Sequence, residues 1–257
     1  MAISENLALH HCRAKYVPDL ENGGYKLASI QKASRPIFNE GFEQVVDRQP
    51  LKTEDENKIV ETSSDDLVKR ATRRAKERCF DYILCNDLDV FTTLTYNPDH
   101  ADRESYSDVY KKLSTWLSNR VQRRGLIYVC VPEYHADGKS IHFHMLSNRE
   151  PLKLVDSGHK KGGQIIYNVD DWDWGFSTSL IVDGEDARTK VAKYIFKYMG
   201  KQLGQKIGGR YYLSGGKLSE PLFVFSEDPS EFGDLESAGY HKYNEGEWGS
   251  FEEWSFL

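Results

Sequence analysis

Residues 126–146 read LIYVCVPEYHADGKSIHFHML and predict a β-hairpin. An Asp-Gly dipeptide, typical of a tight hairpin turn, separates two runs rich in β-branched and aromatic residues. Because side chains alternate between the two faces of a strand, His142 and His144 share one face of the second run. If Glu133 pairs opposite His142, its carboxylate lies on that face too. Two imidazoles and one carboxylate form a mixed nitrogen–oxygen site that suits a divalent metal ion.

Two alternatives accompany this metal site. His135, close to the predicted turn, is a spare candidate for the third ligand. An isolated His-x-His pair is also often an ordinary surface or core feature. The place of Glu133 in the hairpin favours the metal interpretation.

Further strands and helices are expected around the hairpin. Residues 90–96, VFTTLTY, are β-branched and aromatic and predict a strand. Residues 106–123 carry apolar side chains at helical spacing. The other expected elements are a helix from Ser63 or Ser64 to about Asn86, a helix over 186–202, and strands over 164–167, 175–182 and 222–225. Residues 1–60 are polar and weakly patterned, so we expect little regular structure there.

The composition is that of a soluble globular protein. The chain has 257 residues, of which 39% are hydrophobic and 29% charged, and its formal net charge is −6. These values exclude a disordered or fibrous chain, and the length suits one large domain or two small ones. No apolar run approaches the ~18 residues of a membrane span, and we expect no export signal. The four cysteines form no CxxC pair, so we expect reduced thiols in a cytosol.

The charge is unevenly distributed along the chain. Residues 227–257 carry nine acidic side chains, one lysine and seven aromatic residues. We expect this acidic aromatic tail to dock on the body of the protein, with dimerisation or recruitment of a partner as alternatives. Two basic segments could bind a phosphate backbone, although each could also be a solvated helix face. The candidate DNA-binding residues in them are Arg70, Arg73, Arg74, Arg78, Lys190 and Lys193.

A helix over residues 191–201, VAKYIFKYMGK, would present two different faces. At about 100° per residue, one stripe is apolar and the opposite stripe carries phenols and ammonium groups. The second stripe consists of Tyr194, Lys197, Tyr198 and Lys201. A nearby ammonium favours the phenolate form of tyrosine, which is a nucleophile. Taken alone, an ordinary amphipathic helix explains the same pattern.

The order of three motifs resembles the HUH endonuclease superfamily. FTTLTY, then HFHML, then YIFKYMGK match its three motifs, and the paired tyrosines are similar to those of rolling-circle replication initiators of phages and plasmids. The resemblance covers about residues 66–205. It implies an α+β fold, HUH/RRM-like, with a central antiparallel sheet of about five strands and flanking helices.

The resemblance also implies a chemistry and its partners. A tyrosine attacks a phosphodiester of single-stranded or extruded origin DNA and leaves a 5′-phosphotyrosine and a 3′-hydroxyl. Tyr198 makes the first cut and Tyr194 the second, with Lys197 and Lys201 stabilising negative charge. His142, His144 and Glu133 bind Mg²⁺ or Mn²⁺. Host helicase and polymerase are the expected protein partners, and the bacterial host cytosol is the expected location.

These observations divide the chain into three parts and leave rival functions open. We expect a polar N-terminal extension over 1–60, an endonuclease domain over 61–226 and the acidic tail over 227–257. A plasmid mobilisation relaxase or single-strand transposase of the same superfamily is the nearest alternative. A metal oxygenase and a non-catalytic origin-binding protein are more distant ones. For Trp172 and Trp174, packing under a strand is favoured over stacking on unpaired bases.

Overall fold

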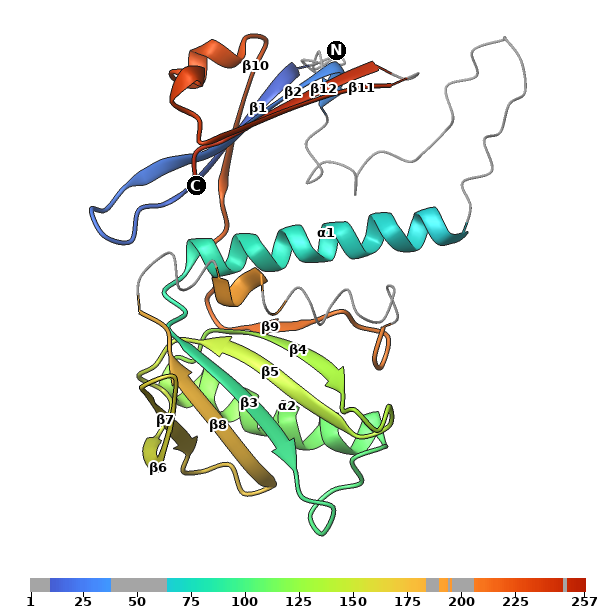
Figure 1. The fold of residues 1–257 in the computed structure, drawn as a ribbon, viewed down its shortest axis with the longest axis vertical. Coiled ribbons are helices and arrows are strands. Elements are labelled where there is room, and N and C mark those ends of the chain that lie inside the picture. The colour runs from blue at the N-terminus through green and yellow to red at the C-terminus, as the bar shows by residue number, and fades with distance from the viewer. Residues whose placement is uncertain (1–9, 38–63, 184–189, 194, 196–205, 247–248) are drawn as a thin grey trace, which may run out of the picture. The chain divides into compact units, whose positions relative to one another are not determined.

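The computed structural model describes residues 10–37, 64–183, 190–193, 195, 206–246 and 249–257. The chain forms two units. The central unit comprises Thr62–Glu220, and the terminal unit combines the two chain ends, Met1–Glu61 and Pro221–Leu257. Each unit has its own antiparallel sheet (Figure 1). The described part of the chain contains no helix with the length and apolarity needed to cross a bilayer.

The central unit is built on a seven-stranded sheet with the order β6-β7-β8-β3-β5-β4-β9. Its strands are β3 (Val90–Tyr96), β4 (Tyr128–Tyr134), β5 (Ile141–Ser147), β6 (Leu154–Lys161), β7 (Gln164–Val169), β8 (Gly175–Ile181) and β9 (Leu213–Gly215). Its long helices are α1 (Ser64–Cys85) and α2 (Tyr106–Arg124), and residues 190–193 and 195 are also helical. The expected α+β fold is confirmed. The sheet is larger than the five strands expected, since the edge strands β6 and β9 were not anticipated.

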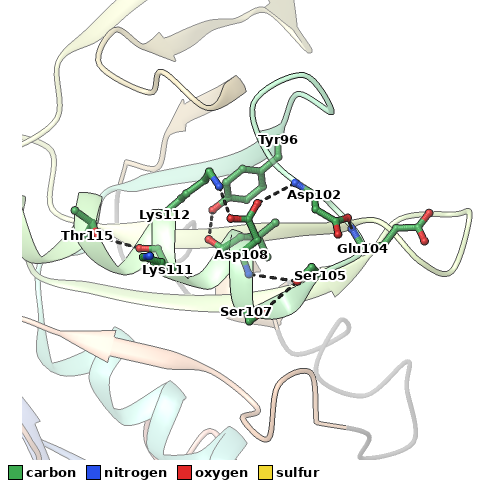
Figure 2. A network of polar contacts seen from close by, with 10 residues as sticks. Tyr96, Asp102, Glu104, Ser105, Ser107, Asp108, Lys111, Lys112 and Thr115 are labelled. Carbon is green, nitrogen blue, oxygen red and sulfur yellow. Dashed lines mark hydrogen bonds and ion pairs between the residues drawn. The ribbon is translucent and has the colours of Figure 1, made fainter.

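One face of this sheet packs on α2. Val90 and Leu94 of β3 and Phe143 of β5 are fully buried there against Val109 and Leu113 of α2. The start of α2 is fixed by polar contacts, shown in Figure 2, in which the Ser105 side chain accepts from the backbone N–H of Asp108. The Tyr96 hydroxyl donates to the carbonyl of Val109 at 2.7 Å and so ties the end of β3 to α2.

The opposite face packs on α1 and on the helical residues 190–195. Cys79 and Ile83 of α1 contact this face, and Leu146 of β5 lies in the same apolar cluster. Ala192 and Ile195 are fully buried in this cluster as well. The apolar stripe predicted for this helix is therefore confirmed at these two residues.

The terminal unit has a five-stranded sheet with the order β10-β1-β2-β12-β11. Its strands are β1 (His10–Pro18), β2 (Tyr25–Ile37), β10 (Leu222–Ser226), β11 (Tyr240–Gly246) and β12 (Gly249–Ser255). Ala14, Ile30 and Trp254 form its buried core, which two 3-10 turns over 229–237 help to cover.

The terminal sheet corrects two expectations. Little regular structure was expected over residues 1–60, yet β1 and β2 lie there, because their partner strands β10 and β12 come from the far end of the chain. The acidic aromatic tail is likewise no simple appendage, since β11 and β12 form a hairpin that extends the same sheet. The strand β10 belongs to this sheet, so the central unit ends at Glu220, earlier than the expected boundary at residue 226.

Candidate metal centre on the β4–β5 hairpin

The predicted hairpin and its register are confirmed. Glu133 of β4 lies directly opposite His142 of β5, and Val131 lies opposite His144. Directly opposed residues of an antiparallel pair project from the same face, so all three candidate ligands share the face that also packs on α1. The Asp137 side chain accepts from the backbone N–H groups of Lys139 and Ser140 and thereby closes the turn between the strands.

The three ligand side chains converge on one point. The Nε2 atoms of His142 and His144 each lie 2.8 Å from Oε2 of Glu133. One ligand atom from each residue lies within 4.8 Å of the other two. His144 is 5% exposed, while Glu133 and His142 are half-buried, so the cluster opens toward solvent on one side. This arrangement suits an ion that completes its coordination with water or phosphate oxygen.

The neighbouring strand β3 supports one of the ligands. Thr93 lies opposite His144 in the β3–β5 ladder, and its hydroxyl oxygen is 3.1 Å from Nδ1 of the imidazole. A proton on Nδ1 would donate to this hydroxyl and direct the Nε2 lone pair at the ligand cluster. The Phe91 ring stacks on the same imidazole with centroids 5.7 Å apart. Sequence analysis identified FTTLTY as a strand but offered no signal that Thr93 contacts a ligand.

The charges of the cluster suit a cation. Burial raises the pKa of the Glu133 carboxyl, but the hydrogen bonds with His144 and His142 outweigh it and hold that pKa below its ordinary value. Burial lowers the pKa of His142, more than its hydrogen bond with Glu133 raises it. At neutral pH the cluster therefore offers a carboxylate and a neutral imidazole at His142, the forms that bind a metal ion.

His135, the spare candidate, lies beside the cluster and outside it. Its ring centroid is 4.2 Å from that of His142, and its Nε2 is buried without a hydrogen-bond partner among the described residues. In the part of the chain that the structure describes, the group of mutually close ligand atoms comprises Glu133, His142 and His144. The structure thus favours the carboxylate as third ligand.

The candidate nucleophiles fall outside the described residues. Tyr194, Lys197, Tyr198 and Lys201 all belong to this undescribed part, so their predicted roles stay predictions. Their helix begins on the metal face of the sheet, because its buried Ala192 and Ile195 share an apolar cluster with Val131. Lys190 and Lys193 are described and exposed.

The basic segment on α1 divides into two groups. Arg70, Arg73 and Arg74 are exposed, and Arg73 lies 3.7 Å from Glu77 one turn further along the helix. Arg78 differs, since it donates to Glu220 at 2.7 Å and to the Tyr82 hydroxyl at 3.0 Å. The first group suits a phosphate backbone, whereas Arg78 is engaged within the central unit.

The two tryptophans serve the core, as expected. Trp172 is 4% exposed and packs edge-to-face against Tyr96 and Trp116. Trp174 is half-buried against the same cluster. Neither ring is placed to stack on an unpaired base.

A hairpin that brings Glu, His and His together on an antiparallel sheet defines an HUH-type metal centre. Residues 89–203 match a family model for replication-associated proteins of the ORF2 type, and this span includes all three ligands and the segment with the paired tyrosines. The chain thus carries a replication-associated domain of the rolling-circle Rep type, which confirms the resemblance drawn from the three motifs. No curated protein and no solved structure matches the chain.

Proposed function

We propose that the protein is a site-specific, metal-dependent DNA nickase and strand-transferase that initiates rolling-circle replication. The observation that carries this proposal is the convergence of Glu133, His142 and His144 within a Rep-type domain. The proposed substrate is single-stranded or extruded origin DNA. Host helicase and polymerase would act on the cleaved product in the bacterial cytosol.

Each residue has a definite task in the proposed reaction. Glu133, His142 and His144 would hold the divalent ion, Mg²⁺ or Mn²⁺, and Thr93 would orient His144. When bound, the ion supplies Lewis-acid polarisation of the scissile phosphate. A tyrosine Oη loses its proton and bonds to phosphorus, while the bond from phosphorus to the 3′-oxygen breaks. The 3′-oxygen takes up a proton and leaves as the hydroxyl that primes synthesis.

Two tyrosines fit a reaction that needs two cuts. Rolling-circle initiation requires one cleavage at the origin and a second to release the displaced strand. Tyr194 and Tyr198 are four residues apart in sequence, so in a helix both phenols project from one face. We assign the first cut to Tyr198, which begins the motif Tyr-Met-Gly-Lys, and the second to Tyr194. Lys197 and Lys201 would stabilise the phenolate and the phosphate.

Covalent trapping on a labelled origin oligonucleotide tests the proposal. We expect a protein–DNA adduct with wild type in Mn²⁺ and none in excess chelator. Tyr198→Phe should lose most single-turnover cleavage, Tyr194→Phe should keep it and lose strand transfer, and the double variant should form no adduct. Tyr25→Phe, an exposed tyrosine of the terminal unit, is the matched control. An adduct formed by the double variant would refute both nucleophiles, and loss of the first cut in Tyr194→Phe alone would reverse the assignment.

A further inference from the structure

We propose that Phe176 is a stacking platform for an unpaired base of the DNA strand whose phosphate occupies the metal centre. This inference rests on the proposed function and adds a base-binding subsite to it. It is carried by the position of Phe176 in the sheet and by the exposure of its ring.

Phe176 belongs to the same row of side chains as two of the metal ligands. It lies opposite Thr95 in the β3–β8 ladder, and Thr95 lies opposite His142 in the β3–β5 ladder. His142 in turn lies opposite Glu133. Since each opposed pair shares a face, the four side chains form one row across β8, β3, β5 and β4. Phe176 therefore projects from the metal face, about 10 Å or two strand spacings from His142.

The phenyl ring is open to solvent at this place. Phe176 is 61% exposed, and in the described part of the central unit it is the one exposed Phe, Trp or Tyr side chain. The intervening Thr95 is small and half-buried, so it raises no barrier between the ring and the ligands. A phosphate bound at the ligand cluster would place the bases of its own nucleotides within reach of the ring.

The chemistry of the ring indicates what it would recognise. A phenyl group has no hydrogen-bonding atom, so it takes any base by its π-face and reads no sequence. A paired base in a duplex offers no free face, so the platform selects unpaired strands. Carbohydrate–phosphate backbone alone has nothing to stack on the ring. The inferred ligand is thus a nucleobase of a single strand.

A thermodynamic cycle on binding alone tests the platform. Fluorescence anisotropy would measure affinity for a labelled oligothymidylate and for an abasic oligomer with the same number of phosphates, both in chelator. We expect Phe176→Ala to weaken oligothymidylate binding about tenfold and to leave binding of the abasic oligomer unchanged. Phe176→Trp should retain oligothymidylate binding. Val155→Ala, which removes another exposed apolar side chain from the central unit, is the matched control and should change neither affinity.

Two outcomes would overturn the platform, and both are separate from failure of the proposed function. Equal affinities of wild type and Phe176→Ala for oligothymidylate would refute it, as would equal losses on both oligomers. These measurements need no cleavage. Base-dependent binding through Phe176 without any covalent adduct would retain the platform and refute the nickase, whereas adduct formation with Phe176-independent binding would do the reverse. An unchanged melting temperature of Phe176→Ala would show that the variant is folded.

Discussion

Thr93 lies directly opposite His144 in the β3–β5 ladder, and its hydroxyl oxygen is 3.1 Å from Nδ1 of that ring. This contact links the first sequence motif to the second. It orients the most buried of the three candidate ligands, whose Nε2 faces Glu133 at 2.8 Å. The threonine-bearing strand therefore acts on the metal centre through His144.

We expect Thr93→Val to weaken Mn²⁺ binding by about 10–100-fold, because the partner that orients His144 is lost while the shape is kept. Titration calorimetry would measure the affinity. Thr92→Val is the matched control, since Thr92 faces the opposite side of the sheet and bonds to Ser179 at 2.9 Å. It should lower stability by about 1 kcal/mol and leave metal affinity unchanged. Equal affinities of Thr93→Val and wild type would show that the hydroxyl does not support the ligand.

The hairpin and its ligands could be predicted from the sequence because the information is local. The Asp-Gly turn fixes the register of the two strands, and the register brings Glu133 opposite His142. Nothing comparable exists for Thr93 or Phe176. Their roles depend on which strands lie beside β5 and β3, and the sequence does not state that order.

The terminal sheet could not be predicted for a related reason. Its strand β1 pairs with β10 more than 190 residues away, as in the register of Cys12 with Ser226. No local pattern announces such a pair. The strand β6 was missed because its sequence LVDSGHKK is mostly exposed and polar and lacks apolar alternation.

Removal of the metal should lower thermal stability. Mn²⁺ at about 100 times its dissociation constant should stabilise the wild type by about 2.7 kcal/mol, because the ion binds the folded cluster only. His144→Ala and Glu133→Ala should lose most of this increment, and His142→Ala should behave alike. His159→Ala, an exposed histidine on β6, is the control that should keep it. Melting curves with Mn²⁺ and with chelator would show the difference, and a full increment in His144→Ala would refute the site.

The exposed arginines of α1 should determine the salt dependence of DNA binding. Each phosphate contact contributes about 0.7 to the slope of log affinity against log salt for a single strand, so the double variant Arg73→Gln/Arg74→Gln should lower the slope by about 1.4. Arg78→Gln should leave the slope unchanged, because Arg78 already bonds to Glu220 and Tyr82. Anisotropy titrations over a range of salt concentrations would measure the slopes. An unchanged slope in the double variant would make this segment a solvated helix face.

Gly175 allows β8 to approach β3 at the point where Phe176 begins its row. A Cβ added at Gly175 would lie 2.3 Å from the carbonyl oxygen of Thr95 and 2.5 Å from the backbone nitrogen of Asn97. Both contacts are with backbone, so the strand itself would have to move. That movement would also disturb the hydrogen bond from the Asn97 N–H to the carbonyl of Trp174, which is 2.9 Å long.

We therefore expect Gly175→Ala to destabilise the protein by about 1–3 kcal/mol and to lower its melting temperature by several degrees. Gly239→Ala is the matched control, since its Cβ would come no closer than 3.9 Å to any neighbour and should cost little. Mn²⁺ binding should persist in Gly175→Ala, because β4 and β5 hold the ligands. Oligothymidylate binding should weaken, since Phe176 moves with β8. Equal melting temperatures of the two variants would contradict the close approach, and loss of Mn²⁺ binding in Gly175→Ala would show that β8 also supports the metal centre.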